Sequence, residues 1–461
     1  MKSMLRRVAA VSAAALLTGS AASAQEAVGD WNGLLQVGGV ELRIGVKIEA
    51  GEGGALTGSI TSPDQSPGDI PISDARMDQG KLSFAVPMIR GRYEGRWDAA
   101  QGAWNGRWIQ GGPIPLTLAK GPVPSRARPQ MPAKPYPYRG EEVAFESAPG
   151  VKLAGTLTLP EGKGPFPAAI LISGSGAQDR DEQLLGHRPF LVLADHLTRR
   201  GIAVLRYDDR GYGKSTGRFQ DATSSDFAVD AAAAVAFLRD RKDIDTGRIG
   251  LIGHSEGGMV GPMVAAKDPT IAFVVLLAGP GAPSRKLMAA QRAAVAKARG
   301  IPPEAVARNE TFAGRIDTLL AETADWEAAK VEVTKVVGQG AAVVGVPVEQ
   351  LIAANQLLFT PWYREFIAHD PRPNLAKLRM PVLAVNGAND LQVIAGQNLP
   401  AIREALKANK DATVIELPGL NHLFQTSATG DPRDYGRIEE TFAPAALATV
   451  SDWVRARAAG R

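Results

Sequence analysis

The chain of 461 residues has no cysteine, only five histidines and, after its N-terminal region, no apolar run long enough to span a bilayer. Without cysteine neither a disulfide nor a thiolate metal site can form, so burial must stabilise the fold. The His-x-x-x-His and His-Glu-x-x-His patterns of zinc hydrolases are also missing. The sequence therefore predicts neither a metal nor another cofactor.

The N-terminus carries the features of a signal peptide. Three cations precede an apolar run over residues 8–17, and Ala22-Ser23-Ala24 offers an Ala-x-Ala cleavage site before Gln25. The run is too short for a membrane anchor. We expect residues 1–24 to be removed and the protein to be periplasmic or secreted, without an anchor.

The charge balance gives no indication of a nucleic-acid partner. The formal net charge is +4, and removal of the three signal-peptide cations would bring it to about +1. We therefore expect a small-molecule partner, and the sequence does not indicate an oligomeric state.

Residues 25–120 show the pattern of a small all-β domain. Apolar and polar or small residues alternate from Val40 to Ile48, and shorter runs of this kind follow between turn residues. Such short strands predict a small barrel or sandwich. Four tryptophans of this region could form a sugar-stacking platform or pack in the core, and we favour the core: Trp31, Trp97, Trp104 and Trp108.

A proline-rich linker is expected over residues 121–140. From residue 141 to the C-terminus, apolar strands alternate with helical stretches, a pattern that predicts an α/β domain with a mostly parallel sheet. The alternation stops for about a hundred residues that are mainly helical, and residues 282–372 are expected to form a cap inserted into this domain.

The candidate nucleophile is Ser255. An apolar strand over residues 249–252 leads into Gly253-His254-Ser255-Glu256-Gly257, and a helical stretch follows. This order is the one that a nucleophile elbow requires. Ser215 lies in a second Gly-x-Ser-x-Gly pattern, but that pattern follows a polar loop instead of a strand. We therefore interpret Ser215 as a turn residue.

A serine nucleophile needs a base and an acid, and the best candidates are His422 and Asp390. Histidine suits proton transfer because its unperturbed pKa is about 6.5. His422 follows the last predicted strand, and Asp390 follows the strand before it. Both therefore belong to the carboxyl edge of the sheet, where the loops of open α/β sheets bind ligands. A turn or helix-cap role is the alternative for Asp390.

Two backbone N–H groups are candidates for the oxyanion hole. One belongs to Glu256, directly after the nucleophile. The other is expected from the loop Gly174-Ser175-Gly176 after an early strand, where we favour Ser175. An ordinary glycine turn is the alternative interpretation of that loop.

These motifs resemble the α/β-hydrolase superfamily. The segment 253–258, Asp390 and His422 carry the general resemblance, and segments 173–181 and 207–211 are similar to those of exported bacterial serine esterases. The resemblance covers residue 141 to the C-terminus and implies the hydrolase fold and a Ser–Asp–His triad. Many members of that group carry His-Gly where this chain has Ser173-Gly174.

The leading hypothesis is an exported carboxylic ester hydrolase that works through an acyl-enzyme on Ser255. A serine peptidase or amidase and a thioesterase are alternatives, because the same triad cleaves amides and thioesters. A catalytically silent binding protein on this scaffold is a third hypothesis. Charged residues that flank the site, including Asp209, Arg180 and Glu256, are expected to form an ion-pair network bracing the loops. Aromatic residues of the cap are expected either to line an acyl pocket or to form the core of the cap: Trp326, Phe359, Trp362, Tyr363 and Phe366.

Overall fold

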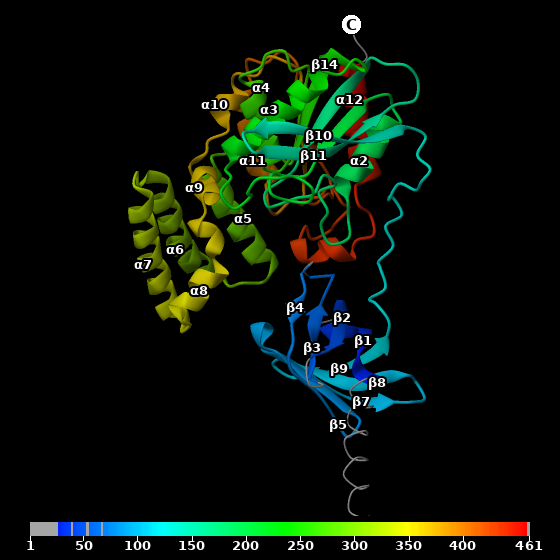
Figure 1. The fold of residues 1–461 in the computed structure, drawn as a ribbon. Coiled ribbons are helices and arrows are strands. Elements are labelled where there is room, and N and C mark those ends of the chain that lie inside the picture. The colour runs from blue at the N-terminus through cyan, green and yellow to red at the C-terminus, as the bar shows by residue number, and fades with distance from the viewer. Residues whose placement is uncertain (1–25, 38–39, 52–54, 66–67, 459–461) are drawn as a thin grey trace, which may run out of the picture. The chain divides into compact units, whose positions relative to one another are not determined.

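The computed structural model describes residues 26–37, 40–51, 55–65 and 68–458. The predicted signal peptide, residues 1–24, lies outside this part of the chain. The described residues form two compact units (Figure 1). The first ends at Ala127 and includes Leu184–Gly186, and the second contains Arg128–Gln183 and the chain from His187 onward.

The N-terminal unit is a nine-stranded antiparallel sheet. Its strands follow the order β4-β3-β2-β1-β9-β8-β7-β6-β5, and β3 also contacts β5, so the sheet curls almost into a closed barrel. Its elements are β1 (Gly29–Val37), β2 (Val40–Ala50), β3 (Leu56–Thr61), β4 (Ile70–Pro71), β5 (Ser73–Asp78), β6 (Lys81–Val86), η2 (Pro87–Ile89), β7 (Gly91–Asp98), β8 (Ala103–Ile109) and β9 (Pro113–Lys120).

Alternation along these strands fills the inside of the curled sheet. In β2, the apolar residues at 42, 44, 46 and 48 are all buried, as a period of two requires. Trp31 and Trp104 are fully buried, and their rings meet edge to face at 5.8 Å. Both rings also contact Trp97. Trp31, Trp104 and Trp108 are therefore core residues, as expected, and Trp97 packs half-buried against this core.

The C-terminal unit contains an eight-stranded sheet of order β10-β11-β13-β12-β14-β15-β16-β17. The pairs β10–β11 and β11–β13 are antiparallel, and all pairs from β13 to β17 are parallel. The mostly parallel sheet predicted from the sequence is thus confirmed. The strands are β10 (Arg139–Ala148), β11 (Val151–Leu159), β12 (Phe166–Ile172), β13 (Ala203–Tyr207), β14 (Ile244–His254), β15 (Val274–Leu277), β16 (Val382–Gly387) and β17 (Ala412–Leu417).

Helices cover both faces of this sheet, which explains why its central strands are buried and mostly apolar. All residues of β13 and β15 are buried. One face packs against α3, α4 and α11, and the other packs against α2 and α12. These elements are α2 (Pro189–Thr198), α3 (Ser224–Arg239), α4 (Gly257–Ala265), α11 (Ala395–Ala405), η4 (Pro432–Arg437) and α12 (Pro444–Ala458).

The predicted helical cap is inserted between β15 and β16 (Figure 1). It has a small core of its own, in which Ile316, Leu320 and Val337 meet Tyr363 and Ile367. Its elements are α5 (Ser284–Ala298), α6 (Pro303–Glu322), α7 (Trp326–Val344), α8 (Val348–Ala354), η3 (Gln356–Phe359), α9 (Pro361–Ala368) and α10 (Arg372–Leu375).

Among the described residues, no single helix has the length and apolar character needed to cross a membrane. Helices α7 and α8 meet that criterion when they are taken together, but they are bent by 115° at the break between them.

Candidate active site

Ser255 lies at a sharp turn between β14, which ends at His254, and α4, which begins at Gly257. Its φ of 51° lies in the left-handed region, which is unfavourable for a residue with a side chain. The Ser255 N–H donates to the Leu277 carbonyl at 2.8 Å, which ties the turn to the end of β15. This is the backbone expected of a nucleophile elbow.

Two glycines make the turn sterically possible. A Cβ atom on Gly253 would lie 2.0 Å from the Gly257 carbonyl oxygen. A Cβ atom on Gly257 would lie 2.1 Å from the carbonyl oxygen of Ile172, at the end of β12. Both distances are far shorter than a van der Waals contact, so any side chain there would force the turn apart.

His422 and Asp390 come together as an ordered pair. His422 Nδ1 lies 2.8 Å from Asp390 Oδ2, and both side chains are buried. The other oxygen, Oδ1, accepts the N–H groups of Gln392 at 2.7 Å and Val393 at 2.9 Å. Asp390 is thereby fixed in place. Because Asp390 contacts His422 at Nδ1, Nε2 is the ring nitrogen that can act as the base.

The elbow and the His422 loop lie side by side. His254 Nε2 lies 3.0 Å from the His422 carbonyl oxygen, and the two imidazole rings are 4.8 Å apart. Within the described part of the chain, no hydrogen bond joins the Ser255 hydroxyl to His422. Catalytic hydrogen bonds of this kind often form only in the complex with substrate.

The loop after β12 lies directly against the nucleophile. A Cβ atom on Gly174 would be 3.2 Å from the Ser255 Cβ. The Gly174 N–H donates to Glu182 Oε1 at 2.8 Å. Among the described residues, the N–H groups of Ser175 and Glu256 have no hydrogen-bond partner. These two predicted oxyanion donors are therefore unoccupied, whereas the Gly174 N–H is not.

Charged groups brace this loop, as expected. Asp209 accepts the Ser173 hydroxyl and the Gln178 N–H, both at 2.8 Å. Burial raises the pKa of Asp209 well above its usual value. Arg180 binds Asp208 through two nitrogens at 3.0 and 2.9 Å.

Glu256 departs from the expectation that it belongs to the ion-pair network. Its Oε1 accepts the Ser224 hydroxyl and, at 2.8 Å, the indole N–H of Trp362 in the cap. Among the described residues, its Oε2 has no partner. Burial raises the pKa of Glu256 to about 7, although the hydrogen bonds from Ser224 and Trp362 lower it. None of the described groups that act on its pKa is a cation, so the desolvation of this carboxyl group is not compensated by opposite charge.

Ser215 and two further histidines of the chain have structural partners elsewhere in the unit. The Ser215 hydroxyl donates to the Asp208 carbonyl at 2.7 Å and accepts the Ala154 N–H, so it is a structural loop serine. His187 is buried between Thr441 and the Tyr435 carbonyl, and its burial lowers its pKa to about 4. His196 contacts Ser451 on α12.

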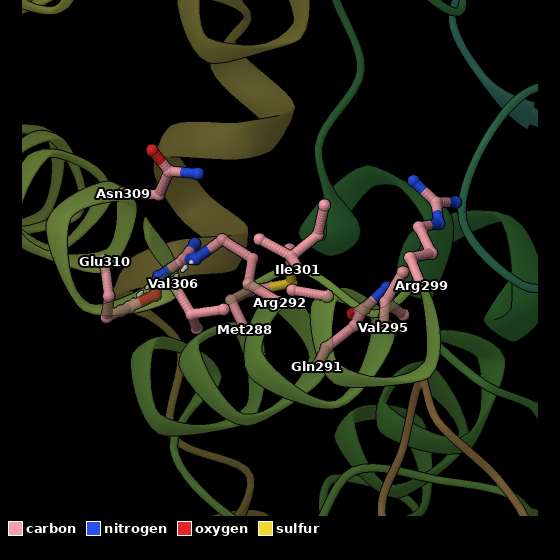
Figure 2. Close-up of a pocket in the computed structure, with 10 residues that line it drawn as sticks. Met288, Gln291, Arg292, Val295, Arg299, Ile301, Val306, Asn309 and Glu310 are labelled. Atoms are coloured by element: carbon pink, nitrogen blue, oxygen red, sulfur yellow. Dashed lines mark hydrogen bonds and ion pairs between the residues drawn. The ribbon is translucent and has the colours of Figure 1, made fainter. Parts of the chain in front are cut away.

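Several pockets lie in the cap, and Ser255, Asp390 and His422 do not line those described for it. A pocket of about 420 Å³ lies between α5 and α6, beside the ion pair of Arg292 and Glu310 (Figure 2). A pocket of about 700 Å³ lies among α5–α9.

The aromatic residues proposed for an acyl pocket divide between several roles. Tyr363 lines the larger pocket and donates its hydroxyl to Asp317 at 2.8 Å. Trp362 points instead to Glu256, and its ring stacks on Phe366 at 5.0 Å. Trp326 lies under the guanidinium of Arg364.

Glu182 is a site residue that the sequence did not reveal. Its carboxylate contacts both Gly174 and His254, yet it lies 72 positions before His254, in a loop without a regular pattern. Its φ of 53° could not be read from the sequence either. In the described part of the chain, no group of three or more His, Asp or Glu side chains is arranged to hold a metal ion.

Comparison with known proteins shows a family match and several partial relatives. The model of the X-Pro dipeptidyl-peptidase (S15) family matches residues 149–424, more than half of the chain. Esterase EstD of Thermotoga maritima is 36% identical over 136 residues, which are 30% of this chain and 32% of EstD. The thiohydrolase aneE of Aspergillus aculeatus is 32% identical over 29% of this chain and 40% of its own length.

The chain thus spans about a third of the length of the first of these relatives and less than half of the second. Among solved structures, a Pyrococcus furiosus esterase aligns over 73% of this chain and all of its own, at 16% identity and a TM-score of 0.44.

Proposed function

We propose that this chain, which belongs to the X-Pro dipeptidyl-peptidase (S15) family within the α/β-hydrolase superfamily, cleaves carboxylic esters through an acyl-enzyme on Ser255. That the chain is a hydrolase follows from the family. The ester substrate, the covalent intermediate and the roles of individual residues are the proposal.

The geometry supports a proton relay across the sheet edge. His422 Nε2 takes the proton of the Ser255 hydroxyl as the oxygen attacks the ester carbonyl, and it later gives that proton to the departing alcohol. Asp390 holds the proton on Nδ1 and stabilises the imidazolium that forms. Water then attacks the acyl-enzyme by the same relay in reverse.

The free N–H groups of Glu256 and Ser175 supply the electrostatic part of the mechanism. Negative charge develops on the carbonyl oxygen as the tetrahedral intermediate forms, and preorganised donors stabilise it. The Glu256 N–H follows the nucleophile, and the Ser175 N–H follows Gly174, where a Cβ atom would lie 3.2 Å from the Ser255 Cβ.

One observation carries the proposal: Ser255 occupies a left-handed turn beside a buried His422–Asp390 pair. Conformational strain of this kind persists where the surrounding structure enforces it, and it is concentrated at functional sites. A catalytically silent binding protein would have no need of a strained serine beside an ordered base.

The names of two relatives favour ester or thioester substrates. EstD is called an esterase and aneE a thiohydrolase. The family model itself is named after a peptidase, and this supports a second candidate, the cleavage of peptide bonds after an X-Pro dipeptide.

The test is hydrolysis of p-nitrophenyl esters from acetate to decanoate, run beside an X-Pro p-nitroanilide. We expect ester turnover to exceed anilide turnover, and Ser255→Ala to lose several orders of magnitude of kcat while remaining folded. A fluorophosphonate should label the wild-type protein once, at Ser255.

Ser215→Ala is the matched control, because Ser215 lies in the other Gly-x-Ser-x-Gly segment and has structural partners only. This variant should keep its activity. Anilide turnover above ester turnover would favour the peptidase. Ester activity that survives in Ser255→Ala would refute the assignment of the nucleophile.

We also propose export through the N-terminal segment, with a free small-molecule ester as the partner. The support is the sequence pattern of residues 1–24 alone. Expression of the full chain in a Gram-negative host, followed by mass spectrometry of the periplasmic fraction, should give a chain that begins at Gln25. An uncleaved chain confined to the cytoplasm would contradict this proposal.

A further inference from the structure

His254, the residue before the nucleophile, has a hydrogen-bond acceptor at each ring nitrogen. Nδ1 lies 2.8 Å from Glu182 Oε1, and Nε2 lies 3.0 Å from the carbonyl oxygen of His422. A backbone carbonyl can only accept a hydrogen bond. Nε2 must therefore carry a proton, whatever the state of the other nitrogen.

Glu182 Oε1 also behaves as an acceptor. It receives the Gly174 N–H at 2.8 Å in addition to its contact with His254 Nδ1. An ionised carboxylate satisfies both contacts as an acceptor, and Nδ1 must then donate. With protons on both nitrogens, His254 is an imidazolium.

The surroundings are consistent with this charge. His254 and Glu182 are both buried, with exposed fractions of 6% and 4%, and a buried charge requires a partner. Burial lowers the pKa of His254, but the charge and hydrogen bond of Glu182, the His422 carbonyl and Asp390 raise it by more. The titratable groups around the pair are thus His422, Asp390 and, beside Glu182, Asp209.

The pair connects three segments that must keep their relative positions during catalysis. His254 adjoins Ser255 at the end of β14, its Nε2 holds the main chain of His422, and Glu182 holds the loop of Gly174 and Ser175. The nucleophile, the base and the oxyanion loop therefore meet at one buried ion pair.

We propose that His254 is a permanent imidazolium paired with Glu182, and that this ion pair positions His422 and the oxyanion loop relative to Ser255. The pair does not touch the reacting atoms, so its members are positioning residues. The positioning role rests on the proposed function, whereas the protonation state of His254 does not depend on it.

The first measurement is the protonation state of His254 in the full-length protein labelled with ¹⁵N-histidine. The signal of His254 is assigned by its loss in His254→Gln. At pH 8 we expect both nitrogens of His254 to show imidazolium shifts. A His254 with a single protonated nitrogen at pH 7 would overturn the proposal, because Glu182 would then hold the proton.

The second measurement is ester kinetics of Glu182→Gln and His254→Gln. We expect kcat to fall about 10- to 100-fold with KM changed less than about twofold, because small displacements of catalytic groups cost this much. His254→Gln should retain more activity than His254→Ala, since its amide can still donate to the His422 carbonyl. Equal kcat values for wild type and Glu182→Gln would overturn the positioning role.

His196→Gln is the matched control, because His196 is also a part-buried histidine, but its partner is Ser451 on α12. It should keep its kcat. Failure of the proposed function would show separately, as a wild-type protein that no fluorophosphonate labels, and the spectrum of His254 would still decide its charge.

Discussion

The left-handed backbone of Ser255 lowers the stability of the protein, because Ser255 carries a side chain. A left-handed φ costs a residue with a Cβ atom roughly 1–2 kcal/mol, and glycine adopts it without this cost. The free energy of unfolding of Ser255→Gly should therefore exceed that of Ser255→Ala by about 1 kcal/mol. The glycine variant should accordingly unfold at a higher temperature. Thermal unfolding of the two inactive variants measures this difference. A less stable glycine variant would contradict the strain described for φ 51°.

Glu256 makes the stability of the protein depend on pH near neutrality. Its pKa is raised from 4.5 to about 7, so the folded state holds a proton that the unfolded state has lost. The stabilisation from this group is complete below pH 4.5 and is lost as the pH rises to about 7. The free energy of unfolding should fall by about 1.4 kcal/mol per pH unit in that range.

Glu256→Gln isolates this contribution, because the amide oxygen can accept the same two hydrogen bonds without titrating. Urea unfolding from pH 4.5 to 8 should show a flatter profile for the variant than for wild type. Identical slopes would mean that Glu256 is ionised throughout. Asp209 also has a raised pKa and contributes to the pH dependence of both proteins. The difference between the two profiles therefore reports the contribution of Glu256.

Helix α9 connects the cap to the nucleophile elbow through the indole of Trp362. Trp362→Phe removes the N–H but keeps an aromatic ring against Phe366. We expect the variant to lose about 1 kcal/mol of stability and the pKa of Glu256 to rise further, since the indole hydrogen bond lowers that pKa. The pH profile of urea unfolding measures both changes.

Trp326→Phe is the control for this contact, because Trp326 lies in the cap against Arg364 and does not bind Glu256. Its pH profile should match that of wild type. A shift of the same size in both variants would mean that loosening of the whole cap, rather than the single hydrogen bond, changes the proton affinity of Glu256.

The strands that carry the site could be predicted because each contains a mostly apolar run followed by a turn with glycine. Strand β10 was not predicted, since Glu141, Glu142 and Glu146 make its pattern resemble a surface segment. It forms an edge of the sheet, where one-sided burial suffices. The start of β14 at Ile244 was likewise hidden by the polar residues 245–248.

The members of the candidate triad could be named because each follows a strand end. The contacts of His254 and Glu256 could not, because their partners Glu182 and Trp362 are 72 and 106 positions away. Such pairings depend on loop conformation and on cap packing, neither of which follows from periodicity.

The two units do not share a hydrophobic core among the described residues, so they should unfold as distinct steps. Trp31→Ala removes a fully buried ring from the N-terminal unit, which costs about 3–5 kcal/mol there. Calorimetry should show one transition moving to lower temperature while the other stays in place.

Phe273→Ala is the counterpart in the other unit, where Phe273 is fully buried. This variant should lower the temperature of the transition of the C-terminal unit and leave the transition of the N-terminal unit in place. A single transition that shifts in both variants would show that the units unfold together.

The glycines on either side of the nucleophile also restrict how this gene can vary. Every single-nucleotide change that replaces a glycine introduces a side chain, and neither Gly253 nor Gly257 has space for even a methyl group. Stepwise substitution at these two codons is therefore excluded. New specificities in descendants of this gene should arise around an unchanged elbow.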